Sequence, residues 1–148
     1  MRILLEQLTG LLSGEPDPIA TMANAASFLF NSLHGVSWAG FYLKRGDDLV
    51  VGPFCGKPAC TRIKPGRGVC GTAFSEQKTI VVPNVHEFPG HIACDPDSRS
   101  EIVIPLFGKD NTPFGVLDLD SYEFDRFDAE TAGFLSKASE IISSRLDY

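Results

Sequence analysis

The sequence predicts an α+β domain in which helices at both ends of the chain enclose a middle rich in short strands. Apolar residues recur with a helical period of about 3.6 near both ends. The middle instead shows short apolar runs separated by Gly, Pro, Asn and Asp. No repeated alternation of strand and helix, as a parallel sheet needs, is present. We expect residues 1–148 to form one domain.

The composition excludes several functional classes. Hydrophobic residues make up 43% and charged residues 22%, which is typical of globular proteins. The net charge is −6, without a block of Lys or Arg, which argues against nucleic acid and anionic membranes as partners. No apolar run approaches the roughly 18 residues of a membrane span, and the first residues lack a signal-peptide pattern. We expect a cytoplasmic protein, in which cysteines stay reduced unless their own chemistry oxidises them.

Three helices are predicted at the two ends. Residues 1–12 form a short amphipathic helix. Asp17-Pro18 supplies an N-cap and a proline at the first position of a second helix, which ends at His34-Gly35. Asp128 caps the last helix, whose apolar positions again repeat with helical spacing. We expect the last helix to pack beside the first two on one face of a sheet.

The strands are expected in the middle of the chain. Residues 37–44 and 49–54 form a hairpin around Gly46-Asp47-Asp48. Further strands are predicted at residues 61–64, 79–82, 101–107 and 114–120.

A G-x-G-x-x-G pattern occupies residues 66–71. A dinucleotide site would require a βαβ unit and an acidic residue about twenty positions later. The chain offers the strand 79–82 and then Asn84 instead. The glycines therefore indicate a tight loop that opens a helix over residues 69–76, whose backbone can approach a ligand closely.

The long loop of residues 85–100 contains the strongest chemical signal. Loops of this length in a compact domain are usually functional or disordered, and Phe88 and Ile92 predict that this one packs. It carries Cys94, and Glu101 follows at the entrance of the next strand. A thiol in a polar loop beside an acid is typical of redox chemistry.

Two pairs of residues lie on the same face of a predicted strand, and each pair can be interpreted in two ways. Trp38 and Tyr42 are four apart in a strand, so they are core aromatics or walls of a pocket. Asp118 and Asp120 are two apart, so they form a solvated strand end or a site that uses two carboxylates.

The four cysteines, Cys55, Cys60, Cys70 and Cys94, are irregularly spaced. Disulfide frameworks are typical of small secreted chains, which this chain is not. No Cys-x2-Cys pair exists, so a zinc site is only weakly indicated, even with His91 three residues before Cys94.

Together these motifs resemble a GAF domain, and more closely the free methionine-(R)-sulfoxide reductase family. The similarity extends from about residue 36 to about residue 128. The segments that carry it are Trp38 to Tyr42, Gly52 to Phe54, Gly66 to Gly71, Gly90 to Asp95, Ser100 to Val103 and Gly115 to Asp120.

The resemblance implies an antiparallel sheet of about six strands, with the N- and C-terminal helices packed on one face and a small closed pocket on the other. It implies that Cys94 is the nucleophile, Cys60 the resolving cysteine and Cys70 an auxiliary one. The residues alone leave Cys60 and Cys70 both open as the resolving cysteine, and Cys55 has no matching role. The family's pocket carboxylates match Glu101, Asp118 and Asp120, and its aromatic wall matches Trp38 and Tyr42.

The activity implied by the resemblance is reduction of free L-methionine-(R)-S-oxide to L-methionine. The cycle passes through a cysteine sulfenic acid and an intramolecular disulfide, which thioredoxin resets with NADPH as the electron source. It needs no metal and no bound organic cofactor. The resemblance is also compatible with a homodimer. The alternative is a GAF-type sensor module that binds a small molecule or responds to redox state.

Overall fold

A computed structural model describes residues 1–148. Along the chain it contains α1 (Arg2–Leu12), α2 (Pro18–Ser32), β1 (Val36–Arg45), β2 (Asp48–Cys55), β3 (Arg62–Ile63), α3 (Gly68–Glu76), β4 (Ile80–Val82), a 3-10 turn (Val85–Glu87), β5 (Ser100–Phe107), β6 (Pro113–Ser121) and α4 (Ala129–Ser144).

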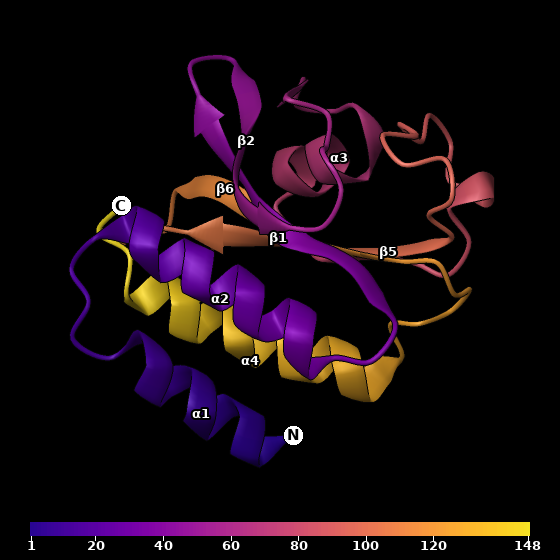
Figure 1. The fold of residues 1–148 in the computed structure, drawn as a ribbon. Coiled ribbons are helices and arrows are strands. Elements are labelled where there is room, and N and C mark those ends of the chain that lie inside the picture. Colours follow the sequence, from indigo (N-terminus) through magenta and orange to yellow (C-terminus); the bar gives the residue numbers. More distant parts are fainter.

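All six strands join one antiparallel sheet in the order β3-β2-β1-β6-β5-β4. The N-terminal hairpin β1–β2 and the later hairpin β5–β6 meet where β1 pairs with β6, so both halves of the sheet share a centre. The helices α1, α2 and α4 lie on one side of this sheet and α3 lies on the other (Figure 1). The predicted α+β class and the six-stranded antiparallel sheet are confirmed.

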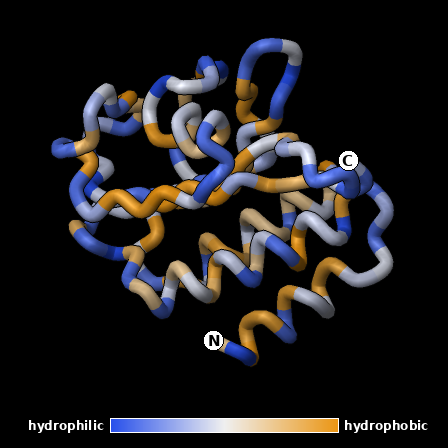
Figure 2. Tube along the Cα trace, turned by 180° about the vertical axis from the view of Figure 1, so that it is seen from behind, coloured by the Kyte–Doolittle hydropathy of each residue, from blue (hydrophilic) through white to orange (hydrophobic).

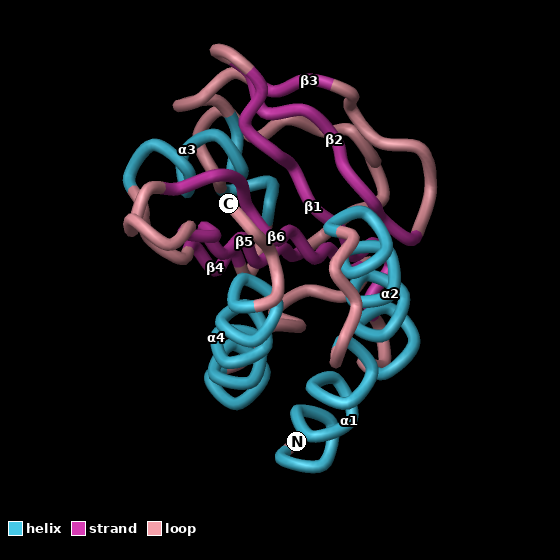
Figure 3. Tube along the Cα trace, turned by 90° about the vertical axis from the view of Figure 1, so that its left-hand side faces the viewer, coloured by secondary structure: helices cyan, strands magenta, loops and turns pink.

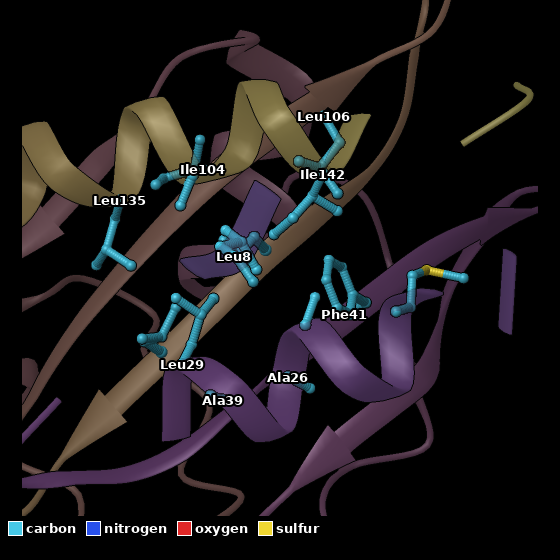
Figure 4. Packing of buried hydrophobic residues seen from close by; sticks show 14 of the residues in the cluster. Leu8, Ala26, Leu29, Ala39, Phe41, Ile104, Leu106, Leu135 and Ile142 are labelled. Atoms are coloured by element: carbon cyan, nitrogen blue, oxygen red, sulfur yellow. The ribbon is translucent and has the colours of Figure 1, made fainter. Parts of the chain in front are cut away.

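The helical side holds the larger core. Alternate residues of the central strands point to this side, among them Phe41 and Ile104, and they pack with Leu135 and Ile142 of α4 (Figure 4). Helices α2 and α4 contact the sheet directly, whereas α1 packs mainly on α2 and α4 and forms an outer layer (Figure 3). The expectation that the terminal helices share one side holds, but α1 is one layer further from the sheet than α2 and α4.

A smaller core lies on the opposite face. There Val103 of β5 and Val116 of β6 pack with Val69 and Phe74 of α3. Apolar residues dominate the central strands, while polar residues gather in the loops above them (Figure 2). None of the four helices combines the length and the apolar character needed to traverse a bilayer.

The local signals at the helix ends act as the sequence predicts. The Asp17 side chain accepts a hydrogen bond from the Ala20 amide at 2.9 Å, and Asp128 accepts one from Thr131 at 2.9 Å. Such N-caps satisfy amides that have no partner inside the helix. They set the first turns of α2 and α4, the two helices that cover the sheet.

The loop of residues 85–99 is ordered against the domain. It begins with the 3-10 turn, where the Val85 side chain is buried, and its end is held by a hydrogen bond from the Arg99 amide to the Ser121 carbonyl at 2.8 Å. The loop therefore packs, with Phe88 against the smaller core as expected, although Ile92 is 38% exposed, and it forms one wall above that core.

Gly71 is required where α3 approaches the chain before it. A β-carbon at this position would collide with the carbonyl oxygen of Lys64. We expect Gly71→Ala to lower the free energy of unfolding by about 1–3 kcal/mol, because the overpacked helix must shift. Gly133→Ala in α4 is the matched control, since nothing lies within 4 Å of its added methyl group. It should instead raise stability by about 0.5–1 kcal/mol. Urea unfolding of both variants tests this, and equal effects would contradict it.

Candidate active site

A small cavity of about 50 Å³ lies on the face of the sheet opposite the three packed helices. Its floor comes from β1, β5 and β6, and its walls come from α3 and the loops that carry Cys60 and Cys94. Seven of the eight site residues predicted from the sequence line it, namely Trp38, Tyr42, Cys70, Cys94, Glu101, Asp118 and Asp120. Cys60 does not line the cavity but is bonded to a residue that does.

Three carboxyl groups form the floor of the cavity. Glu101 of β5 stands directly opposite Asp120 of β6, and Asp118 lies two residues along the same face. Glu101 is only 6% exposed and Asp118 only 5%. Asp118 Oδ1 has no hydrogen-bond partner. Asp118 is therefore buried rather than part of a solvated strand end, while Asp120 beside it stays partly exposed and also lines the cavity.

Burial raises the pKa of Glu101, Asp118 and Asp120 well above the usual range of carboxyl groups. The second cause is the negative charge of the neighbouring carboxylates, which disfavours a further ionisation. Glu101 interacts with both aspartates, so the three carboxyl groups influence one another's ionisation. The cluster can therefore keep a proton at neutral pH and donate it to a bound molecule.

His91 lies beside this cluster. Its Nε2 is 3.7 Å from Glu101 Oε1, and burial lowers the pKa of the imidazole. A neutral His91 next to a protonated Glu101 avoids an isolated buried charge. The imidazole of His91 therefore interacts with the carboxyl group of Glu101.

The structure distinguishes the four cysteines. Cys60 and Cys94 form a disulfide, with a Cα–Cα distance of 5.5 Å. Cys70 is a free thiol on α3, and burial followed by the charges of the nearby carboxylates raises its pKa, so it stays protonated. Cys55 is also free and ends β2 outside the cavity. Of the two resolving cysteines that the sequence leaves open, Cys60 is the one bonded to Cys94.

Trp38 and Tyr42 are both core aromatics and walls of the pocket, so both interpretations of their spacing hold. They belong to the smaller core and also line the cavity. Their rings stack with centroids 6.0 Å apart. Trp38 Nε1 donates to the Lys57 carbonyl at 3.1 Å and the Tyr42 hydroxyl donates to the Cys60 carbonyl at 2.8 Å. The aromatic wall thus holds the backbone of the loop that carries Cys60.

The N-terminus of α3 also opens on the cavity. Arg67, Gly68 and Val69 line it, and Gly68 has a positive φ of +63°. The sequence analysis did not select Arg67, although the glycine pattern around it predicts a backbone that approaches a ligand. Free amides at a helix start attract anions. One wall of the cavity therefore suits an anionic group, and the floor suits a cationic group or a proton acceptor.

Cys70, Glu101 and Asp118 could together approach a metal ion, since one ligand atom from each lies within 4.8 Å of the others. This set differs from the Cys and His residues considered for zinc in the sequence. Three ligands fall short of the four protein ligands typical of a structural zinc site.

Comparison with known proteins agrees with this architecture. The family model for the GAF domain matches residues 17–146. The free methionine-R-sulfoxide reductase of Escherichia coli is 50% identical, over 86% of this chain and 76% of that protein. The Saccharomyces cerevisiae protein of the same name is 39% identical, over 95% and 84%. The X-ray structure of the Neisseria meningitidis free methionine-R-sulfoxide reductase in complex with its substrate has a TM-score of 0.93 at 44% identity, covering 97% and 86%.

The cavity on an antiparallel sheet backed by terminal helices makes this chain a member of the GAF domain family. Within that family it belongs to the free methionine-R-sulfoxide reductases, which confirms the resemblance identified from the sequence.

The raised pKa of Asp118 predicts a pH-dependent stability. The unfolded chain releases this proton near pH 3.9, and the folded chain releases it at higher pH, so stability falls as pH rises between the two values. We expect Asp118→Asn to be more stable than the wild type at pH 7 and equally stable near pH 3. Urea unfolding of the oxidised proteins at both pH values measures the difference.

Asp147→Asn is the matched control, because Asp147 is exposed and the adjacent Lys109 ammonium lowers its pKa. It should give no gain in stability at pH 7. An Asp118→Asn protein that is less stable than the wild type at pH 7 would contradict the assignment of a buried, protonated cluster.

Proposed function

We propose that this protein is a thiol-dependent reductase that converts free L-methionine-(R)-S-oxide to L-methionine. The observation that carries the proposal is the Cys60–Cys94 disulfide at a buried cavity whose floor holds three carboxyl groups. The names of the Escherichia coli and Saccharomyces cerevisiae relatives support the same activity. A sensor module that only binds a small molecule would need the cavity but not the pair of bonded cysteines.

The carboxyl cluster supplies the acid that the reaction needs. A sulfoxide sulfur is a poor electrophile until its oxygen accepts a proton or a strong hydrogen bond. Glu101, Asp118 and Asp120 keep a proton available because their pKa values are raised by burial and by one another. An ionised member of the cluster can hold the substrate's ammonium group at the same time.

Cys94 then attacks the activated sulfur as a thiolate. Oxygen passes to the cysteine, so that methionine leaves and Cys94 becomes a sulfenic acid. The Cys60 thiol displaces the hydroxyl group from that sulfur, forming the disulfide and releasing water. Cys70 stays outside this exchange, because its raised pKa keeps it a protonated thiol beside the carboxyl groups.

The cavity also explains a preference for the free amino acid. We propose that the start of α3, with Arg67, receives the substrate's carboxylate, while the acidic floor receives its ammonium group. A peptide-bound residue has neither charge and cannot pass its chain through walls formed by α3 and the Cys94 loop.

The proposal includes thioredoxin as the reductant and a cytoplasmic location, because a cycle that ends in a disulfide needs a dithiol to restore it. The thiols carry the electrons, so no metal or organic cofactor is needed.

Residues 1–148 act as one GAF domain, whose terminal helices share a core. Exposed apolar side chains on the first two helices, Ile3, Leu11 and Ile19, offer a surface for a homodimer.

Substrate selectivity tests the function. With thioredoxin, its reductase and NADPH, we expect NADPH consumption with free methionine-R-sulfoxide. The S epimer and a peptide-bound R-sulfoxide should give rates at least a hundredfold lower, because the cavity binds both charges and one configuration at sulfur. Absence of turnover with every sulfoxide, in folded and reduced protein, would overturn the proposal and favour the sensor alternative.

Cysteine variants test the order of the steps. Cys94→Ser should form no methionine, because the nucleophile is lost. Cys60→Ser should form one methionine per chain and then stop in the thioredoxin assay, because the sulfenic acid has no partner. Cys55→Ser is the control and should keep full turnover, since Cys55 lies outside the cavity. Methionine measured in a rapid-quench reaction gives the yield of a single turnover, and methionine measured in steady state gives the turnover rate. Full turnover by Cys94→Ser would contradict the mechanism.

A further inference from the structure

Tyr122 contacts both of the segments that carry the disulfide cysteines. It follows the last residue of β6 and does not line the cavity. Its hydroxyl donates a hydrogen bond to Asp95 Oδ2 at 2.7 Å, and Asp95 is the neighbour of Cys94. The Lys57 ammonium lies 5.4 Å from the centre of its ring, and Lys57 belongs to the loop of Cys60. One side chain therefore joins two loops that are distant in sequence.

These contacts matter because no other hydrogen bond joins the two loops. No backbone hydrogen bond connects residues 56–61 with residues 88–99. No side-chain hydrogen bond or ion pair connects them directly either. In the reduced protein the sulfur–sulfur bond is also absent. Apart from the attraction between the Lys57 and Asp95 charges, which are too far apart for an ion pair, the polar connection between the loops then depends on the hydrogen bond and the cation–π contact of Tyr122.

The backbone around Tyr122 is well fixed. The Ser121 hydroxyl donates to the Gly35 carbonyl at 2.6 Å, and the Arg99 amide donates to the Ser121 carbonyl at 2.8 Å. On the other side, the Ser100 hydroxyl donates to the Glu123 carbonyl at 2.6 Å. Tyr122 is thus held by the end of the sheet, and it can impose a position on two loops that lack regular structure.

We propose that Tyr122 is a positioning residue for the disulfide-forming step, an inference that rests on the proposed reductase cycle. In that step the Cys60 thiol attacks the Cys94 sulfenic acid, the new sulfur–sulfur bond replaces the sulfur–oxygen bond, and water leaves with the thiol proton. The rate of such an intramolecular reaction depends on how often the two sulfur atoms meet. By holding Asp95 and Lys57, Tyr122 keeps the loops close enough for Cys60 to intercept the sulfenic acid before further oxidation.

The test variant is Tyr122→Phe, which removes one hydroxyl and keeps the ring under Lys57. Reduced protein is mixed with one equivalent of methionine-R-sulfoxide, and methionine, dimedone-trapped sulfenic acid and free thiols are followed in time. We expect methionine to form at the wild-type rate. Disulfide formation should slow about three- to tenfold, the loss expected for one hydrogen bond, and trapped sulfenic acid should accumulate.

Tyr148→Phe is the matched control. Tyr148 is 38% exposed and Tyr122 is 37% exposed, but Tyr148 stacks on Phe114 away from the cavity. This variant should form the disulfide at the wild-type rate. Tyr122→Ala, which loses both contacts, should slow disulfide formation more than Tyr122→Phe. Urea unfolding of the oxidised variants identifies any that fail to fold.

A parallel reaction separates this inference from the proposed function. Hydrogen peroxide converts the Cys94 thiolate to the sulfenic acid with release of hydroxide, so the disulfide step can be measured without any sulfoxide. A slower step in Tyr122→Phe under peroxide supports the positioning role even if sulfoxide turnover fails. Wild-type rates of disulfide formation in folded Tyr122→Phe, or an equal slowing of methionine formation, would overturn the role.

Discussion

The arrangement of this protein depends on three carboxyl groups that cluster on one face of a sheet, two of them buried and the third partly exposed. Glu101 and Asp120 face each other across β5 and β6, and like charges in such a pair repel. Full ionisation in this buried place is costly, so the cluster retains a proton. Because the cluster destabilises the fold, the free energy of folding must come from other parts of the protein, and the retained proton must have a use. The helical core supplies that stability, and the proposed reaction in the cavity above the acids would use the proton.

The sheet separates these two tasks. Alternate residues of each central strand point to opposite faces, so Ile102 and Ile104 pack against the helices while Glu101 and Val103 face the cavity side. The larger core thus lies on the face away from the site, and only the smaller core shares a face with the cavity. Trp38 and Tyr42 belong partly to both roles, since they fill the smaller core and fix the loop backbone that leads to Cys60.

Local signals predicted most of the fold. Helical periodicity, N-caps at Asp17 and Asp128 and turn residues located the helices and the hairpins, because each depends on neighbours in sequence. Same-face spacing also placed Asp118 and Asp120 together. The partner of Cys94 and the opposition of Glu101 to Asp120 depend on strand register and on loops far apart in sequence. The contacts of Tyr122 were missed for the same reason, since no local pattern marks a residue that joins two distant loops.

The Cys60–Cys94 bond spans 34 residues and encloses β3, α3 and β4. A cross-link of that span limits the unfolded chain enough to add about 4 kcal/mol to the free energy of unfolding in the chain-entropy model. The free energy of unfolding is therefore highest in the oxidised protein, after the disulfide has formed, and lowest in the reduced protein that can react with substrate. Because proteases cut opened forms, the same model implies that the oxidised protein resists proteolysis better than the reduced protein.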